Sequence, residues 1–179
     1  GTNSKLSTDN LVVGKEGKGT LNITDNGLVV AKNVGRDERS QLSVINFDDG
    51  TLELLSSEPS SLLFNNSNNR TLASSVPEPT SLLFNNFTAD NTINLASGGG
   101  TIDTNEFDIT VFDDARITGS GDFTKAGTGK LAMNSATKAW TGNTNINQGI
   151  LQLDGNYSMR EGEVLGIALN SLTDYGQLN

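Results

Sequence analysis

Short alternating runs of apolar and polar residues, separated by Gly, Asn and Asp, occupy most of the chain. Near the start, the stretches 11–13, 19–23 and 27–30 each place apolar residues directly beside a glycine. An apolar residue at every second position is typical of a half-buried β-strand, and Gly and Asn are typical of the turns between strands. The pattern therefore predicts short strands joined by tight turns.

The second half of the chain predicts strands in quick succession, with no interval long enough for a helix. We expect strands over residues 92–96, 100–103, 107–112, 116–118, 121–124, 129–133, 143–146 and 149–153. After residue 154 the alternation becomes less regular, although apolar residues return at 164–169 and 175–178. The chain as a whole is predicted to be all-β.

The middle of the chain contains a duplication. The sequence EPSSLLFNN at 58–66 returns as EPTSLLFNN at 78–86, which is 20 residues later. A repeat of this size indicates stacked coils, in which equivalent residues lie above one another. We therefore expect a ladder in which the Asn amides bond to one another and the aromatic rings stack in the core; its pairs are Leu63 with Leu83, Phe64 with Phe84, and Asn65 with Asn85.

The composition favours a fold that needs little apolar surface. Only 34% of the 179 residues are hydrophobic and 6% are aromatic, whereas Gly, Asn and Thr together make up about a third of the chain. A solenoid can be stable with such a composition because each coil contacts only its neighbours. We expect a right-handed parallel β-helix, a β-solenoid, with about eight coils of roughly 20 to 25 residues each.

Charge and missing residue types exclude several classes of function. The net charge of −9 makes nucleic acid and anionic lipid poor partners. The chain contains neither cysteine nor histidine. The absence of cysteine excludes disulfides and thiolate metal sites, and the absence of histidine excludes imidazole metal sites and histidine-dependent triads. We expect no cofactor, no metal and no catalytic residue.

The remaining candidates for chemistry are carboxylates. Paired carboxylates could cleave glycosidic bonds, and adjacent ones could bind calcium. Asp is also common in turns, because its side chain closes them by local hydrogen bonds. We interpret the candidates as turn residues, with catalysis and calcium binding as the alternatives; they are Asp48, Asp49, Asp103, Asp108, Asp113 and Asp114.

Three other features have a functional and a structural interpretation. Ser135 and Lys138 have the S-x-x-K spacing of penicillin-binding enzymes, but they lie between predicted strands instead of on a helix. The segment 14–20 resembles a phosphate loop without its spacing, so we interpret it as a turn. Trp140 could stack on a sugar, but we expect it to pack at a corner of a coil.

The outward faces of the predicted strands are rich in Asn, Thr, Ser and Asp. Rows of these residues could bind extended partners or simply face solvent.

One stretch carries a family resemblance. The run 119–153 contains a series of glycines and apolar residues in a fixed order: Gly127, Gly129, Leu131, Met133, Trp140, Thr141, Gly142, Ile146, Gly149, Leu151 and Leu153. This series closely resembles the passenger-associated transport repeat of bacterial autotransporters, with Phe123, Met133 and Trp140 in place of Leu, Leu and Tyr. Residues 11–27 also resemble a repeat of adhesin-type passengers.

The resemblance implies an organisation and a location. Residues 1–153 would form the β-helix stem of a passenger, and residues 154–179 would begin an autochaperone-like region. We expect the chain to be a fragment of a longer protein that lies on the bacterial surface, attached to its own C-terminal outer-membrane β-barrel, or is released from the surface.

The resemblance also implies a non-enzymatic function. We expect an adhesin that binds a host extracellular-matrix protein or cell-surface receptor and assists its own translocation by folding. One alternative is self-association that causes aggregation or biofilm. Another is a scaffold for an enzyme domain upstream, or a polysaccharide-processing β-helix. The residues that bind the ligand are not identified by the sequence.

Overall fold

The computed structural model describes residues 2–35, 42–55, 81–85, 92–111, 116–133, 139–154, 157–170 and 175–179. Within these ranges every regular element is a β-strand, which confirms the predicted all-β class. All pairings between named strands are parallel. No helix in the described part of the chain could cross a membrane.

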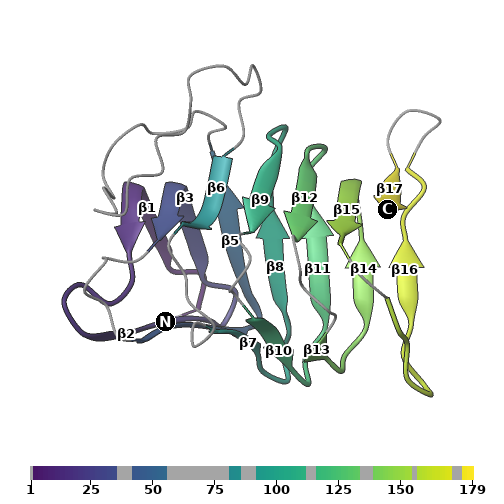
Figure 1. The fold of residues 1–179 in the computed structure, drawn as a ribbon, viewed down its shortest axis with the longest axis horizontal. Coiled ribbons are helices and arrows are strands. Elements are labelled where there is room, and N and C mark those ends of the chain that lie inside the picture. Colours follow the sequence, from purple (N-terminus) through teal and green to yellow (C-terminus); the bar gives the residue numbers. More distant parts are fainter. Residues whose placement is uncertain are drawn as a thin grey trace.

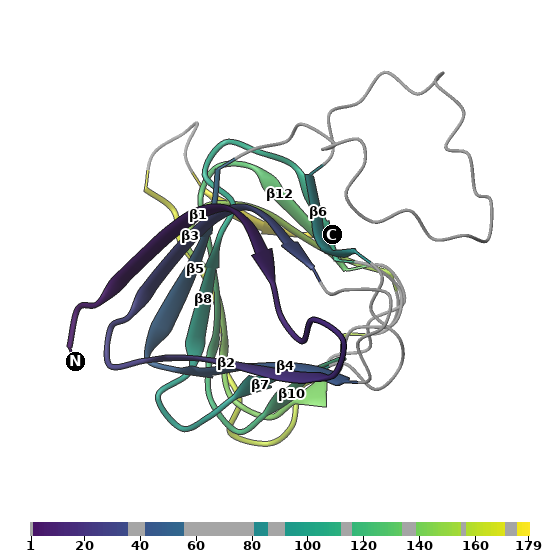
Figure 2. The same cartoon turned by 90° about the vertical axis from the view of Figure 1, so that its left-hand side faces the viewer.

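The strands stack into three faces that enclose one core (Figures 1 and 2). The first face contains β3 (Leu28–Gly35), β5 (Gly50–Leu54), β8 (Gly100–Asp103), β11 (Phe123–Ala126), β14 (Thr144–Ile146) and β16 (Leu165–Ile167). The second face contains β6 (Ser81–Asn85), β9 (Ile109–Val111), β12 (Lys130–Met133), β15 (Gly149–Leu153) and β17 (Gly176–Leu178). The third contains β2 (Lys18–Thr24), β4 (Leu42–Asp48), β7 (Thr92–Leu95), β10 (Arg116–Gly119) and β13 (Ala139–Trp140).

The long strand β3 joins the first and second faces. Its residues Leu28 to Ala31 pair with β5, and its residues Val34 and Gly35 pair with β6. β1 (Lys5–Val12) pairs along the whole of β3 from the other side. The two faces therefore form one continuous sheet that bends through a corner.

The coil is a right-handed parallel β-solenoid of about five turns. Seen from the N-terminal end in Figure 2, the chain runs clockwise as it recedes, in agreement with the predicted hand. The expected eight coils are too many. One turn, from Gly50 to its partner Gly100, takes fifty residues, about twice the predicted length. The turns from Thr101 to Thr124 and from Thr124 to Asn145 take 23 and 21 residues, as expected.

The core consists of inward rows that continue from coil to coil. In β5 the burial alternates strictly, with Leu52 and Leu54 inward and Thr51 and Glu53 partly exposed. On the third face Ile23, Phe47 and Leu95 are in register and all are buried. The apolar positions of the alternating pattern are therefore the buried ones. The strands at 19–23 and 92–96 are among those predicted from the sequence, whereas the strands over 42–54 are not.

The second copy of the duplicated segment contains β6, whose partners on both sides are described. β6 lies between β3 and β9, so Leu83 is paired with Val34 on one side and with Val111 on the other. Asn85 is in register with Gly35. Leu63, Phe64 and Asn65 lie outside the described residues, as do the side chains of Phe84 and Asn85.

An asparagine ladder forms on the third face. Asn46 Nδ2 donates to Asn22 Oδ1 at 2.7 Å, and Asn94 Nδ2 donates to Asn46 Oδ1 at 3.4 Å. The three residues occupy the same outward position on β2, β4 and β7. Hydrogen bonding between stacked Asn amides is therefore present, but in residues that no repeat in the sequence identified.

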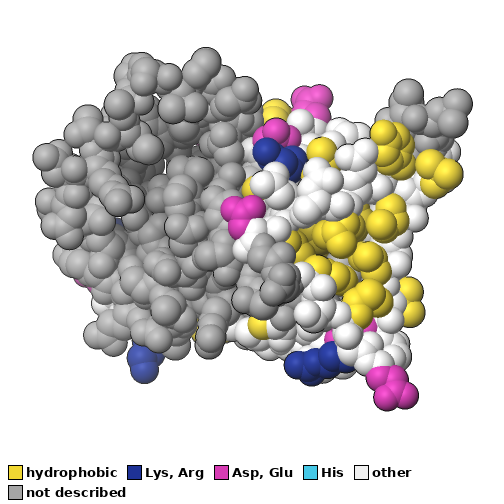
Figure 3. Space-filling model, turned by 45° about the vertical axis from the view of Figure 1, so that its right-hand side comes forward, with side chains coloured by type: hydrophobic (Ala, Val, Ile, Leu, Met, Phe, Trp, Pro, Cys, Tyr) yellow, Lys and Arg dark blue, Asp and Glu magenta, His cyan; other side chains and the backbone are white. Residues whose placement is uncertain are grey.

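Residues after 154 continue the solenoid. β16 adds to β14 on the first face and β17 adds to β15 on the second. Among the described residues of this segment, exposed large apolar side chains include Met159, Val164, Ile167, Leu169 and Tyr175. Figure 3 shows hydrophobic side chains gathered toward this end of the molecule.

Candidate binding groove on the first face

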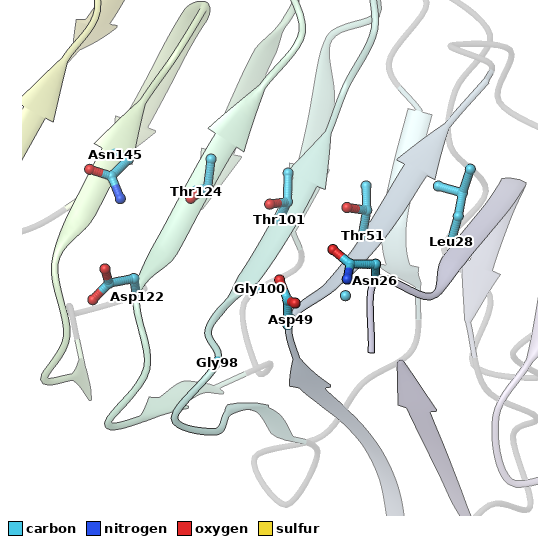
Figure 4. A pocket seen from close by; sticks show the side chains of 11 residues that line it. Asn26, Leu28, Asp49, Thr51, Gly98, Gly100, Thr101, Asp122, Thr124 and Asn145 are labelled. Carbon is cyan, nitrogen blue, oxygen red and sulfur yellow. The ribbon is translucent and has the colours of Figure 1, made fainter. Parts of the chain in front are cut away.

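A shallow groove of about 460 Å³ runs across the first face, parallel to the axis of the solenoid. It crosses five strands, from β3 to β14, and Figure 4 shows its side chains in two rows. The lining is almost entirely polar: Asn26, Leu28, Asp49, Gly50, Thr51, Gly98, Gly100, Thr101, Asp122, Thr124 and Asn145.

The first row lies on the strands themselves. Leu28, Thr51, Thr101, Thr124 and Asn145 are partners in register on five successive strands. Because the residues that follow Thr51 and Thr101 are the buried Leu52 and Ile102, the threonines must point outward. The row repeats at the spacing of neighbouring strands, about 4.8 Å.

The second row lies on the turns that lead from the third face into the first. It contains Asn26, Asp49 and Asp122, with glycines in the coil between the two carboxylates. A Cβ on Gly98 would come within 2.7 Å of Asp48 Oδ1, and Gly99 has a φ of +74°. Tight stacking of the coils therefore requires glycine at both positions, and the missing side chains leave the groove open.

The hydrogen-bonding groups of the first row have no partner within the described residues. No bond is formed there by the hydroxyls of Thr51, Thr101 and Thr124 or by the amide of Asn145. The asparagine row of the third face differs, because its amides bond to one another. The groove therefore holds hydrogen-bonding capacity that the fold itself does not use.

Three of the carboxylates considered for catalysis accept hydrogen bonds from the backbone. Single oxygens of Asp48, Asp103 and Asp108 accept from the backbone N–H groups of Gly98, Asn105 and Lys130 at 2.7 Å, 2.8 Å and 2.9 Å. In the part of the chain that is described, no three acidic residues lie close enough together to hold a metal ion. The turn interpretation is confirmed for Asp103, whose bond to Asn105 spans two residues. Asp48 and Asp108 instead link coils, because their partners lie 50 and 22 residues further along the chain.

Other candidates from the sequence fall outside the groove or outside the described residues. Asp113, Asp114, Ser135 and Lys138 belong to the undescribed segments. Asp49 is exposed and contributes to the groove, whereas none of Asp48, Asp103 and Asp108 does. Sequence patterning missed the groove itself, because Thr51, Thr101 and Thr124 come from coils separated by different numbers of residues.

Trp140 is a core residue, as expected. Its side chain is 1% exposed, and its ring lies 5.1 Å from that of Phe123 at a tilt of 51°. Its Nε1 donates to Thr144 Oγ1 at 3.0 Å, so the indole nitrogen is satisfied inside the protein. A ring held in this way cannot stack on a sugar.

The residues of the transport-repeat resemblance occupy structural positions. Its apolar members Leu131, Met133, Ile146, Leu151 and Leu153 are all buried. The N–H group of Thr141 donates to the carbonyl of Gly119 in the preceding coil. The glycines stand where coils touch: a side chain on Gly127, Gly129, Gly142 or Gly149 would overlap the backbone of the coil below.

Lys125 is a buried residue that the sequence pattern did not single out. It lies in the inward row between Ile102 and Ile146 and has no exposed surface. Its Nζ donates to the carbonyls of Ala126 and Gly127 at 2.7 Å and to that of Gln148 at 3.3 Å. Burial lowers the pKa of Lys125 to about 8, while Asp103 and Asp108 act in the opposite direction. The sequence did contain a signal for this burial: Lys125 lies two residues after Phe123 in the same strand, so both side chains point to the same side.

Compared with protein-family models, with curated proteins and with solved structures, the chain matches none of them. The chemical character of the groove must therefore be inferred from its own residues. It offers hydroxyl, amide and carboxylate groups in a repeating row, and its lining contains no lysine, arginine or aromatic side chain among the described residues.

Proposed function

We propose that the chain is the stem and binding part of a surface-exposed bacterial autotransporter passenger without enzymatic activity of its own. It attaches the bacterium to host extracellular matrix or to a host cell-surface receptor. One observation carries the proposal. The residues that resemble the transport repeat are those that a stacked coil needs, with apolar members in the core and glycines at the contacts between coils.

The solenoid also suits a chain that folds as it is exported. Each strand of a face pairs only with the strands of adjacent coils, so a folded coil is a template for the next one. Folding outside the cell then holds the exported part there and helps to draw the rest of the chain outward.

The hydrogen bonds of the carboxylates support a non-enzymatic role. Asp48, Asp103 and Asp108 each use an oxygen to accept from a backbone N–H group, and Asp122 accepts from the backbone and side chain of Asn143. Groups held in this way stabilise the fold and are poorly placed to transfer protons to a substrate.

A self-associating passenger is the second candidate. The exposed apolar side chains near β16, with Leu169 77% exposed and Val164 56% exposed, favour it. In that case, contact between copies of the chain would cause bacterial aggregation.

The test is binding of the purified chain to surfaces coated with matrix proteins or glycans, with serum albumin as the control coating. The mass of the same sample is measured by sedimentation. We expect saturable binding by a monomer. Concentration-dependent self-association without binding would favour the second candidate, and the absence of both would contradict both candidates.

A further inference from the structure

We infer that the groove on the first face binds a neutral, extended polysaccharide chain that lies along the axis of the solenoid. The inference rests on the adhesive function proposed above and gives the chemical class of the host ligand. It is carried by the unused hydrogen-bonding groups of the groove, by their regular spacing and by the charge of the lining.

The hydrogen-bonding groups suit a polyhydroxylated ligand. The hydroxyls of Thr51, Thr101 and Thr124 can each donate and accept, and the amide of Asn145 can do the same. Sugar hydroxyls also donate and accept, so they can pair with every one of these groups. An apolar ligand would instead leave the groups desolvated and unpaired, at a cost in binding free energy.

The spacing suits a polymer. The threonine row repeats once per coil, at about 4.8 Å, and continues over several coils. One pyranose ring of an extended β-1,4-linked hexose chain advances by a comparable distance. Although alternate rings of such a chain are turned over, each ring has hydroxyls on both edges, so successive sugars can meet successive threonines.

The charge of the groove selects a neutral chain. Its charged side chains are Asp49 and Asp122, both acidic, and the whole chain has a net charge of −9. A sulfated or uronic-acid polymer would be repelled by these carboxylates. The described lining also lacks an aromatic platform, so affinity must come from several weak polar contacts and should increase with the length of the sugar chain.

The carboxylates of the groove are suited to binding more than to cleavage. Both oxygens of Asp122 are already held by Asn143: Oδ1 accepts from its backbone N–H at 2.8 Å and Oδ2 from its side-chain amide at 3.2 Å. Asp49 stands two coils away, about 9.6 Å at the spacing of neighbouring strands, which is the upper limit for the paired carboxylates of glycoside hydrolases.

The test measures binding of the whole chain to neutral β-1,4-linked gluco-, manno- and N-acetylglucosamine oligosaccharides of increasing length, by calorimetry and by chemical shifts. The double variant Thr101→Val with Thr124→Val removes two hydroxyls from the middle of the groove. Val retains the shape of Thr and favours strands, so the fold should persist. The matched control is Thr118→Val, an outward residue of β10 on the third face.

We expect at least one of the three series to bind, with affinity that increases with length. The double variant should weaken binding by about tenfold or more, and the control should leave it unchanged. Heparin is the anionic comparison and should bind more weakly than the neutral chain. The inference is overturned if no neutral series binds, if both variants bind alike, or if heparin binds best.

The two proposals fail in different ways. If the purified chain binds no coated surface, the adhesive function fails, whatever the groove does with free oligosaccharides. If the chain binds a coated surface and the double variant binds it equally well, adhesion stands and the groove is not its site.

Discussion

At the scale of single residues, Lys125 shows how a solenoid of this width can enclose a charge. The residue is buried in the inward row between Ile102 and Ile146, and its ammonium group donates to the carbonyls of Ala126, Gly127 and Gln148. The carbonyl of Gln148 belongs to the following coil, so the side chain joins two coils from inside. The burial of the charge is the main reason why the pKa of Lys125 falls to about 8.

This pKa predicts a pH dependence of stability. Between about pH 8 and 10.5 the folded chain has released the proton while the unfolded chain still holds it. The stability of the wild type relative to Lys125→Met should therefore increase through this window, by up to about 3 kcal/mol. Denaturant unfolding of both proteins at a series of pH values measures the difference. A difference that is constant or that decreases with pH would contradict the assignment.

At the scale of elements, the turns are determined by how closely successive coils approach. Gly127 has a φ of +80°, and a side chain on Gly129 would overlap the carbonyl of Phe107 in the coil below. These contacts give a physical reason for the fixed order of glycines in the transport-repeat resemblance. The same closeness between coils, at Gly98 and Gly99, leaves the second row of the groove without a side chain between Asp49 and Asp122.

A pair of substitutions tests the role of these contacts between coils. Gly129→Ala should destabilise the fold by roughly 1 to 3 kcal/mol, because the backbone of the neighbouring coil must shift. Gly17→Ala is the matched control, since a Cβ at that position would have no atom within 4 Å, and it should change stability by less than about 1 kcal/mol. Thermal and denaturant unfolding give both values. Equal effects of the two substitutions would contradict the role of coil contact.

At the scale of the whole molecule, stability is expected to vary along the axis. β8 is paired on both sides, with β5 and with β11, whereas β16 is paired with β14 alone among the described strands. In a solenoid the free energy of opening depends on the contacts between neighbouring coils, so a strand with one neighbour opens more readily.

Hydrogen exchange measures this gradient. The amides of β5, β8 and β11 should exchange more slowly than those of β16 and β17, by one or more orders of magnitude. Mass spectrometry of peptides from the exchanged protein reports each region at neutral pH. Uniform protection from β5 to β17 would instead mean that the solenoid unfolds as a single cooperative unit.

The sequence by itself determined the local features of this protein. Alternation in 100–103 and 149–153 predicted β8 and β15 with their correct bounds, and the resemblance to a known repeat predicted that Trp140 is buried. Side chains alternate along any strand, so the period of the pattern is enough to identify it. The class of the fold follows from the same pattern.

Only the tertiary structure decided which strands are neighbours. The duplication suggested that Leu63 lies next to Leu83, yet the structure pairs Leu83 with Val34 and Val111. The asparagine ladder, the inward position of Lys125 and the threonine row likewise depend on register between coils. Register is a long-range property, because turns of unequal length, such as the fifty residues from Gly50 to Gly100, bring distant residues together without a fixed period in the sequence.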